Sequence, residues 1–319
     1  MYQIILYYNF SPIKNVPMFR ADHKRKCQSL DLLGRVYVSE NGINGTLAGT
    51  PENIEIYKNF LREQPGFEKT EFKEDASDRR PFVKLICRIR PEVVALYADE
   101  SIDPSKERGK HLTPRQWREV LESKEDIQLI DVRNNYESAI GYFEGAIRPD
   151  VKNFFDFPKW LEEAKLDKNK KTLMYCTGGI RCEVFSLYME KKGFKDVEQL
   201  HGGIINYGKQ EKGAHYKGKC FVFDDRLAVP IGGEQESLTK CEITGEPCDA
   251  YLNCANMDCN RLFICSLEGA RKFNGCCSEE CSRAKKLRPF DANDIYGPTR
   301  KWYNYYDMDK EEFKKLNKA

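Results

Sequence analysis

A short apolar run that ends in a glycine-rich cysteine loop is the strongest constraint on the fold of this chain. Leu173–Tyr175 is typical of a buried strand, and Cys176–Arg181 (CTGGIR) follows it directly, before a helical pattern. A second apolar run at Ile127–Val132 and a helix that begins after Thr113-Pro114 extend this alternation. Short strands that alternate with helices favour a parallel sheet covered on both faces. We therefore predict an α/β fold from about residue 110.

The loop residues favour a reactive thiolate at Cys176. Gly178 and Gly179 let the backbone curl so that successive N–H groups point inward and form a nest for an anion. The helix N-terminus and Arg181 add positive potential, so we expect the pKa of Cys176 to lie below the value of about 8.5 for a free thiol. The alternative is a small buried hydrophobe, but a strand-terminal Cys before Gly-Gly and Arg has no packing rationale. The predicted anion cradle consists of Thr177, Gly178, Gly179, Ile180 and Arg181.

Several further residues of the same region are candidates for supporting roles. We predict that Asp131, Arg133 and Glu137 pair with one another or with the loop arginine and hold the cradle in shape. Cys182 is either a structural residue or a resolving thiol, and both interpretations stay open. His201 precedes Gly-Gly and is interpreted as a turn residue that closes the domain.

Residues 1–95 show a separate pattern of strands and helices. Asn-Gly pairs between two apolar runs predict a hairpin, and Pro51 is placed as the first residue of a helix. The resulting β-α-β-β-α-β order predicts a ferredoxin-like (acylphosphatase-like) α+β sandwich. Its expected strands are Ile4–Tyr8, Arg35–Ser39, Thr46–Ala48 and Pro81–Ile89, with helices ending near Leu33 and Gln64.

The thirteen cysteines are expected to be reduced thiols, metal ligands or catalysts. The N-terminal residues MYQIILYYNF include neither a basic segment before the apolar run nor a small-residue cleavage site. No apolar stretch reaches the roughly 18 residues of a membrane helix. We therefore expect a cytoplasmic protein without a membrane partner, in which disulfides are rare.

The central motifs together resemble a rhodanese domain over about residues 110–215. One position departs from the usual rhodanese pattern, because Gly141-Tyr142-Phe143 stands where Gly-His-Ile is common; this removes a structural His and leaves the nucleophile. The matching motifs are Asp131-Val132-Arg133, Glu137, Gly145-Ala146, Cys176–Arg181 and His201–Ile204.

Motifs along nearly the whole chain resemble the tRNA uridine hydroxylase family. They are the N-terminal ENGINGTLAGT, the loop CTGGIRCE, and the tail sequences CDAYLNCANMDCNRLF and GCCSEEC. The resemblance implies oxygen-dependent conversion of the wobble uridine of tRNA to 5-hydroxyuridine, with Cys176 as the matching nucleophile. It also implies molecular oxygen as oxidant and an electron donor, which the sequence does not identify.

The other residues offer no familiar redox centre. The four histidines form no His-x-Asp/Glu pair for a two-His-one-carboxylate iron site, and the chain has no Gly-x-Gly-x-x-Gly fingerprint. A thiol or persulfide at Cys176 is thus the best available redox group. The histidines are His23, His111, His201 and His215.

Residues 216–319 are predicted to form a linker and a Cys-rich C-terminal region. In the family that the chain resembles, paired Cys-x-x-Cys knuckles are expected, but their second positions here are Thr244 and Glu268. Zinc binding, reduced or locally bridged structural thiols, and a redox relay to Cys176 are the three alternatives. The candidate metal ligands are Cys241, Cys248, Cys254, Cys259, Cys265, Cys276, Cys277 and Cys281.

A tRNA partner would have to be met by local basic surfaces. The 52 Lys and Arg residues nearly balance the 50 Asp and Glu residues, so net charge decides nothing about partners. Two basic segments with or near aromatic residues are candidates for RNA binding, namely Arg283–Arg288 and Arg300–Tyr306. The alternative interpretation is that they are a solvated basic helix end and a tail whose aromatic residues pack on the rest of the protein. The N-terminal sandwich, with its hairpin Asn41–Thr46, is another possible docking surface.

Two other functions remain open. A sulfurtransferase that uses thiosulfate or a protein persulfide would need only the central domain, and the six-residue loop Cys176–Arg181 is compatible with it. A partner protein would then supply sulfur, as one would supply electrons to a hydroxylase. The third alternative is a non-catalytic scaffold that binds RNA through its outer domains.

Overall fold

The computed structural model describes residues 1–98, 102–123, 125–233 and 235–292. The chain forms two compact units. The first consists of residues 1–221 together with 230–234, and the second consists of residues 222–229 together with those from Gln235 onward.

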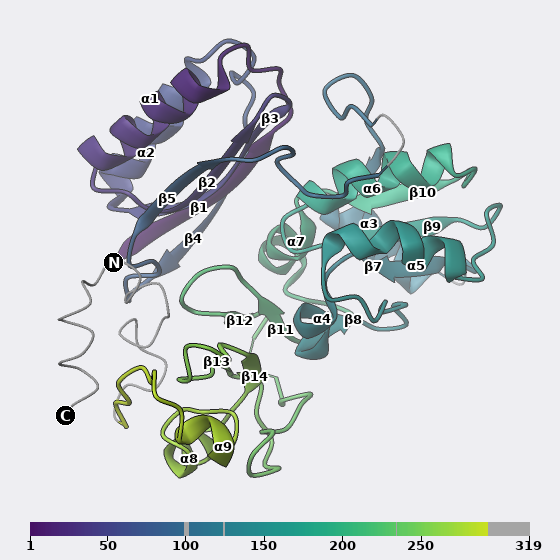
Figure 1. Ribbon diagram of the computed structural model, residues 1–319. Coiled ribbons are helices and arrows are strands. Elements are labelled where there is room, and N and C mark those ends of the chain that lie inside the picture. Colours follow the sequence, from purple (N-terminus) through teal and green to yellow (C-terminus); the bar gives the residue numbers. More distant parts are fainter. Residues whose placement is uncertain (99–101, 124, 234, 293–319) are drawn as a thin grey trace. The chain divides into compact units, whose positions relative to one another are not determined.

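The N-terminal part of the first unit is a five-stranded sheet with two helices on one side (Figure 1). The strand order is β4-β1-β3-β2-β5, in which β2 and β5 are parallel and the other pairs are antiparallel. Ile5, Tyr7, Val36 and Val38 point toward the helices and form the core with them. The elements are β1 (Tyr2–Asn9), α1 (Val16–Ser29), β2 (Leu33–Ser39), β3 (Gly42–Gly49), α2 (Pro51–Arg62), β4 (Phe72–Ser77) and β5 (Leu85–Ile89).

The ferredoxin-like prediction is confirmed as an α+β sheet, but the choice of its fourth strand was wrong. The strand that pairs with β1 is Phe72–Ser77, and the segment predicted from Pro81 to Ile89 instead contributes β5 beside β2. Phe72–Ser77 has no apolar alternation because three consecutive positions, Lys73 to Asp75, are charged. An edge strand tolerates this pattern, since only one neighbour pairs with it.

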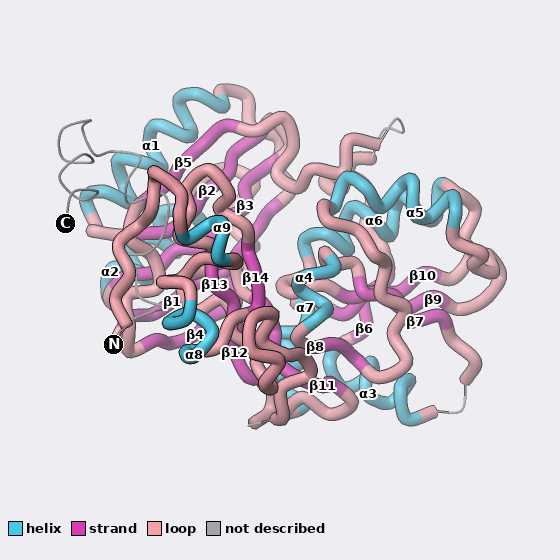
Figure 2. The backbone as a smooth tube through the Cα atoms, turned by 60° about the horizontal axis from the view of Figure 1, so that its bottom comes forward, coloured by secondary structure: helices cyan, strands magenta, loops and turns pink. Residues whose placement is uncertain are grey.

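The central part of the first unit contains the predicted parallel sheet. Its order is β6-β10-β9-β7, every neighbouring pair is parallel, and β9 lies inside the sheet (Figure 2). β8 pairs with β11 in an antiparallel ladder, so the chain continues as a strand beyond residue 215, where we expected a linker. The elements are β6 (Lys110–Leu112), α3 (Pro114–Glu122), β7 (Gln128–Asp131), α4 (Asn135–Ala139), β8 (Gly141–Phe143), the 3-10 turn η1 (Phe154–Asp156), α5 (Phe157–Glu163), β9 (Thr172–Tyr175), α6 (Ile180–Lys191), β10 (Val197–Leu200), α7 (Gly203–Glu211) and β11 (Tyr216–Phe221).

The second unit has short elements and a core rich in cysteine. β13 and β14 form an antiparallel pair, and Cys254, Cys265 and Cys276 are fully buried. All thirteen cysteines lie in the described part of the chain, and none forms a disulfide there. The elements after β11 are β12 (Ala228–Pro230), β13 (Tyr251–Asn253), β14 (Leu262–Ile264), α8 (Leu267–Lys272) and α9 (Glu279–Ser282).

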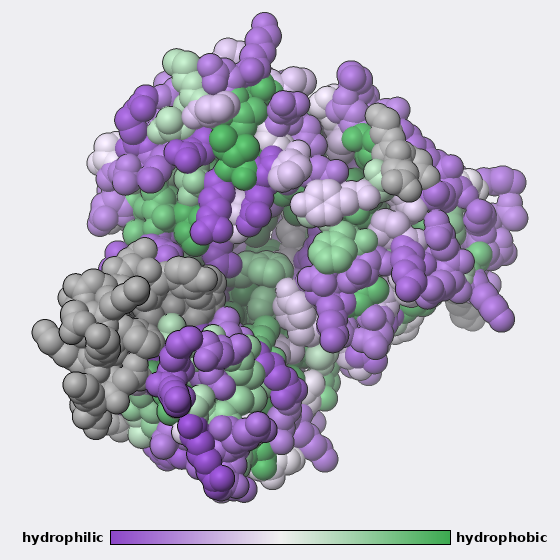
Figure 3. Space-filling model, viewed as in Figure 1, coloured by the Kyte–Doolittle hydropathy of each residue, from purple (hydrophilic) through white to green (hydrophobic). Residues whose placement is uncertain are grey.

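On the face shown in Figure 3, hydrophilic residues predominate and hydrophobic residues form small separate groups. Among the described residues, no helix combines the length and the apolar character that are needed to cross a membrane.

Candidate active site

Cys176 lies directly after β9, at the carboxyl end of a strand inside the parallel sheet. The loop turns sharply at Gly179, whose φ of 102° is readily adopted only by glycine, and α6 begins at Ile180. The N–H of Ile204 donates to the carbonyl of Cys176 at 3.0 Å and thereby ties the loop to the start of α7. Only 1% of Cys176 is exposed to solvent. The loop therefore holds the sulfur in a fixed, water-poor position.

Donors around the sulfur stabilise its thiolate form. The N–H of Gly179 donates to the Cys176 Sγ at 3.1 Å. Burial by itself would raise the pKa of Cys176, but the hydrogen bond from Cys182, the charge of Arg181 and the backbone N–H groups of Arg181 and Cys182 outweigh burial and lower the pKa to about 5. This arrangement favours the thiolate form of Cys176 at neutral pH.

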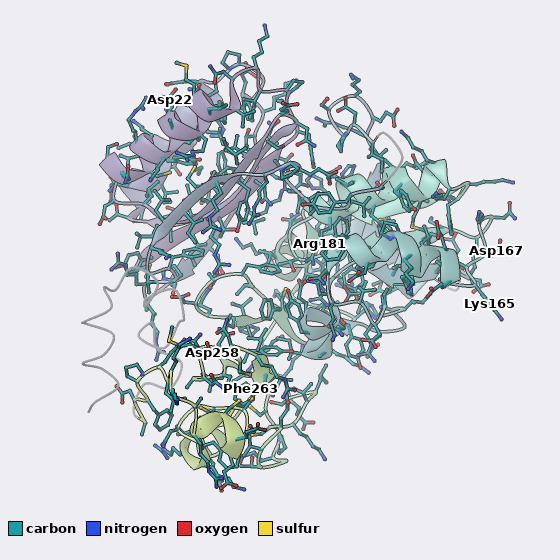
Figure 4. The ribbon with its side chains drawn as sticks, viewed as in Figure 1. Asp22, Lys165, Asp167, Arg181, Asp258 and Phe263 are labelled. Atoms are coloured by element: carbon teal, nitrogen blue, oxygen red, sulfur yellow. The ribbon has the colours of Figure 1, made fainter. Side chains whose placement is uncertain are left out.

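A bidentate ion pair fixes the cation of this site. The Arg181 Nη1 and Nη2 donate to the two carboxylate oxygens of Glu137 at 2.6 and 2.7 Å. Thr177 joins the pair, because its hydroxyl donates to Glu137 at 3.3 Å and accepts from Arg181 at 3.3 Å. Burial opposes the charge of Arg181, yet Glu137 raises its pKa above the usual value. Arg181, labelled in Figure 4, is therefore a permanent positive charge in the first turn of α6.

The other two predicted supporting residues form a separate pair. Arg133 donates to both carboxylate oxygens of Asp131 at 2.8 and 2.6 Å, and both side chains are fully buried. The Tyr175 hydroxyl also donates to Asp131, at 2.9 Å. Arg133 donates further to the carbonyl of Gly141 at 2.6 Å, which links β7 to β8. Of the three predicted supporting residues, Glu137 contacts the cradle directly, whereas Asp131 and Arg133 brace the sheet behind it.

Cys182, which the cradle prediction did not include, also contacts the Cys176 sulfur. Its side chain is fully buried and its thiol is hydrogen bonded to the Cys176 sulfur. Burial and this bond raise the pKa of Cys182 well above its usual value, so Cys182 stays protonated and donates to the thiolate. A thiol so near the Cys176 sulfur suits both a structural donor and a resolving thiol.

A polar network around Glu183 was missed by sequence reasoning. The Tyr8 hydroxyl donates to Glu183 Oε1 at 2.9 Å, and the His111 Nε2 lies 3.0 Å from the same oxygen. Tyr8 and Glu183 are 175 residues apart, so local pattern gave no sign of their contact. The only available signal was the acidic residue that follows Cys182 in the loop motif. His201, interpreted as a turn residue, lies before α7 with its Nε2 3.3 Å from Glu71 Oε2.

The pKa of Cys176 gives a first testable prediction. The measurement is a pH titration of the ultraviolet absorbance of wild type and of Cys176→Ser. The difference between the two curves reports the Cys176 thiolate, and we expect its midpoint near pH 5. Because the folded pKa lies below that of the unfolded thiol, the associated stabilisation is complete above about pH 8.5 and declines as pH falls toward 5. A midpoint above pH 8 would contradict the anion cradle.

Four of the eight candidate metal ligands come together in the second unit. The Sγ atoms of Cys254, Cys259, Cys277 and Cys281 all lie within 4.8 Å of one another. Cys277 Sγ is 3.8 Å from both Cys259 Sγ and Cys281 Sγ. Four sulfurs placed about 2.3 Å from a tetrahedral zinc are about 3.8 Å apart, so this group fits zinc. Cys241, Cys248, Cys265 and Cys276 lie outside this group.

Hydrogen-bond donors around these sulfurs also suit a metal. The N–H of Cys277 points at Cys254 Sγ at 3.4 Å, and the Asn256 side-chain amide points at Cys281 Sγ at 3.5 Å. Such donors stabilise metal-bound thiolates. Asp258, labelled in Figure 4, directly precedes Cys259 and forms an ion pair with Lys286 at 3.1 Å.

The predicted basic segment Arg283–Arg288 is largely neutralised within the second unit. Arg283 pairs with Glu279 and Lys286 with Asp258. Arg288 is 2% exposed and donates to the carbonyl of Cys254 and to Asn260. Three of the four cations of this segment therefore already have partners, which leaves only the exposed Lys285 of the segment for a phosphate contact. The second predicted segment, Arg300–Tyr306, lies outside the described residues.

The parallel sheet and the thiolate loop at the end of β9 define a protein of the rhodanese class. Family models match along the chain: "UPF0176 acylphosphatase like domain" over residues 2–93, "Rhodanese-like domain" over 113–210 and "Rhodanase C-terminal" over 217–282. The tRNA uridine(34) hydroxylase of Bacillus cereus (strain AH820) is 44% identical over 291 residues, which cover 90% of this chain and 91% of that protein. The tRNA uridine(34) hydroxylase of Bacillus thuringiensis (strain Al Hakam) has the same identity and coverage. The chain belongs to the tRNA uridine(34) hydroxylase family, which confirms the resemblance.

Among solved structures, a rhodanese-like domain protein from Staphylococcus aureus is 26% identical. The match covers 31% of this chain and 91% of that chain, with a TM-score of 0.28.

Proposed function

We propose that the protein hydroxylates the wobble uridine of tRNA at carbon 5 and that Cys176 is its catalytic residue. The observation that carries the proposal is the buried sulfur held by the N–H of Gly179 at 3.1 Å and by the neighbouring charge of Arg181. The 44% identity to named tRNA uridine(34) hydroxylases over 90% of the chain supplies the substrate and the reaction. A tRNA substrate in turn supports a cytoplasmic location.

Hydroxylation sets requirements that the chain meets only in part. One atom of molecular oxygen enters the C5–H bond of uracil, and the second leaves as water after two electrons and two protons are supplied. We propose molecular oxygen as the oxidant and a partner protein or small reductant as the electron source. The chain's own contribution is a thiolate that is nucleophilic at neutral pH, with the Arg181–Glu137 pair fixing its charge environment.

The three family matches support a division of labour along the chain. We propose an N-terminal α+β domain over residues 1–95, a rhodanese domain over 110–215 that carries the thiol, and a linker with a Cys-rich region over 216–319. For the four-sulfur group of the last region we propose zinc, held by Cys254, Cys259, Cys277 and Cys281. Bound zinc would supply structure there, because four sulfur ligands leave it no open position for substrate.

Sulfur transfer is the second candidate function, because the same cradle favours a persulfide anion as well as a thiolate. The donors at Gly179, Arg181 and Cys182 would serve either anion. A thiosulfate-to-cyanide assay on the purified protein distinguishes the two functions, since a hydroxylase that carries no sulfane sulfur forms no thiocyanate.

The decisive test of the proposed function is nucleoside mass spectrometry of tRNA from cells that lack the gene. We expect 5-hydroxyuridine and its derivatives to disappear from the wobble position and to return when the wild-type gene is restored. A deletion that leaves these nucleosides unchanged, in cells without a second hydroxylation enzyme, would refute the proposal and leave sulfur transfer as the leading function.

A further inference from the structure

The N-terminal sheet has one face that no helix of its own domain covers. α1 and α2 lie on the same side of the sheet (Figure 1), where Val36 and Val38 are fully buried. Side chains alternate along a strand, so Arg35 and Tyr37 point to the opposite side, which we call the open face. In the parallel pairing of β2 with β5, Tyr37 is opposite Arg88, which places Arg88 on the open face as well.

Three arginines at this edge of the sheet lack acidic partners. Arg88 and Arg90 are exposed and Arg35 is half-buried. Within the described parts of the chain, no carboxylate forms an ion pair with Arg35, Arg88 or Arg90, unlike Arg115, which pairs with Glu119. Uncompensated positive charge concentrated on one surface is the electrostatic signature of a phosphate-binding site.

An aromatic platform accompanies this charge. The guanidinium of Arg90 lies over the ring of Tyr37, 5.3 Å from its centroid. Planar groups of this kind are the surfaces on which unpaired RNA bases stack. Asn44, on the neighbouring strand β3, is paired with Tyr37 in the sheet register and donates to the carbonyl of Val93 at 3.2 Å.

The same row of the sheet leads to the cysteine loop. Sheet register joins Tyr8 on β1 to Asn44 on β3, and Asn44 to Tyr37 on β2. Two strand spacings separate Tyr8 from Tyr37, which is about 10 Å. Tyr8 bonds Glu183 on α6, and a Cβ added at Gly178 would lie only 2.5 Å from the Leu6 side chain. Through its strand register, the row of the sheet that carries Tyr37 thus leads to Tyr8, which contacts α6 directly after the loop of Cys176.

We propose that the open face, defined by Arg35, Tyr37, Arg88 and Arg90, binds the single-stranded anticodon loop of the tRNA substrate. The inference deepens the proposed function and rests on it, since it assigns the surface that receives the substrate. Phosphates bind the arginines, a splayed base stacks on the Tyr37–Arg90 platform, and the strand register directs the next nucleotides toward Tyr8 and the loop. A single strand is favoured over a duplex because a flat sheet with an aromatic platform reads exposed bases.

The test is binding of a fluorescent anticodon stem-loop RNA to the full-length protein, measured by anisotropy over a range of salt concentrations. We expect Arg35→Gln/Arg88→Gln/Arg90→Gln to weaken binding at least about tenfold and to reduce the salt slope by about two, at about 0.7 per lost phosphate contact. Tyr37→Ala should weaken binding about 5- to 100-fold with little change in the salt slope, as expected for lost stacking.

The matched control removes the same charge from the opposite side of the same domain. Lys14→Gln/Lys24→Gln/Arg25→Gln changes three exposed cations in or just before α1. If the open-face variant binds weakly because of where its charges lie, and not because total positive charge is lost, this control should keep an affinity within about twofold of wild type. Circular dichroism and thermal melting check that the variants fold. We expect the open-face variant to fold because, within the described residues, Arg35, Arg88 and Arg90 form no ion pairs whose loss would destabilise the domain.

The outcomes separate the surface from the reaction. Equal loss of affinity in both triple variants, or none in the open-face variant, overturns the assignment of this surface even if the wild type forms 5-hydroxyuridine. Selective loss in the open-face variant supports the assignment even if tRNA from the deletion strain keeps its 5-hydroxyuridine, in which case the proposed function alone fails.

Discussion

A strain that carries Cys176→Ala in place of the wild-type gene should contain no more 5-hydroxyuridine-derived wobble nucleosides than the deletion strain. In the purified protein, given a competent electron donor, the rate should fall by about three orders of magnitude or more, as expected when a nucleophile is removed. The physical reason is that the site is built around one sulfur: the loop donors at Gly179 and Cys182 have no other anion to stabilise. Mass spectrometry of tRNA nucleosides, with immunoblots for protein level, measures the effect.

Variants at Cys182 serve as the control for this result. Cys182→Ser keeps a hydrogen-bond donor beside the thiolate, whereas Cys182→Ala removes it and should shift the activity profile to higher pH. If Cys182 donates only a hydrogen bond, the serine variant retains more activity than the alanine variant. Equal and complete loss in both would identify a resolving thiol instead. Full modification in cells that carry Cys176→Ala would contradict both enzyme functions and support an RNA-binding scaffold.

The sequence allowed the parallel sheet and the position of the cysteine loop to be predicted because their signals are local. A buried strand, two glycines and an arginine lie within a single stretch, and in the structure the Gly179 N–H does contact the sulfur. The edge strand β4 was missed for the converse reason. Three of its consecutive residues are charged, and it pairs with a strand far away in the sequence, as Tyr2 of β1 is opposite Ser77 of β4.

Contacts that depend on the path of the chain could not be predicted from local pattern. Tyr8 reaches Glu183 only because the N-terminal sheet lies against the start of α6. Likewise the spacing of Cys254, Cys259, Cys277 and Cys281 lacks paired Cys-x-x-Cys knuckles, yet the fold of the second unit brings the four sulfurs within 4.8 Å. Sequence spacing identifies a metal site only where the ligands lie on standard turns.

This sulfur group leads to the prediction with the largest expected effect on stability. We expect the purified protein to contain one zinc per chain and Cys277→Ser to lose it, because Cys277 Sγ lies 3.8 Å from two other sulfurs of the group. Structural zinc contributes about 10–16 kcal/mol in small domains, far more than the few short strands and helices of the second unit could replace. Chelation should therefore abolish the cooperative unfolding of this unit, seen as a lost thermal transition and faster hydrogen exchange.

A matched cysteine substitution separates metal loss from a general effect of removing a thiol. Cys248 is buried in the same unit but lies outside the four-sulfur group, so Cys248→Ser should retain zinc and the thermal transition. Elemental analysis and native mass spectrometry measure the metal directly. Protein that contains no metal when purified under reducing conditions, and whose melting does not change with added zinc or chelator, would contradict the site and favour reduced structural thiols. A mixed disulfide between the tail and Cys176, trapped during turnover, would instead identify the cysteines as a redox relay.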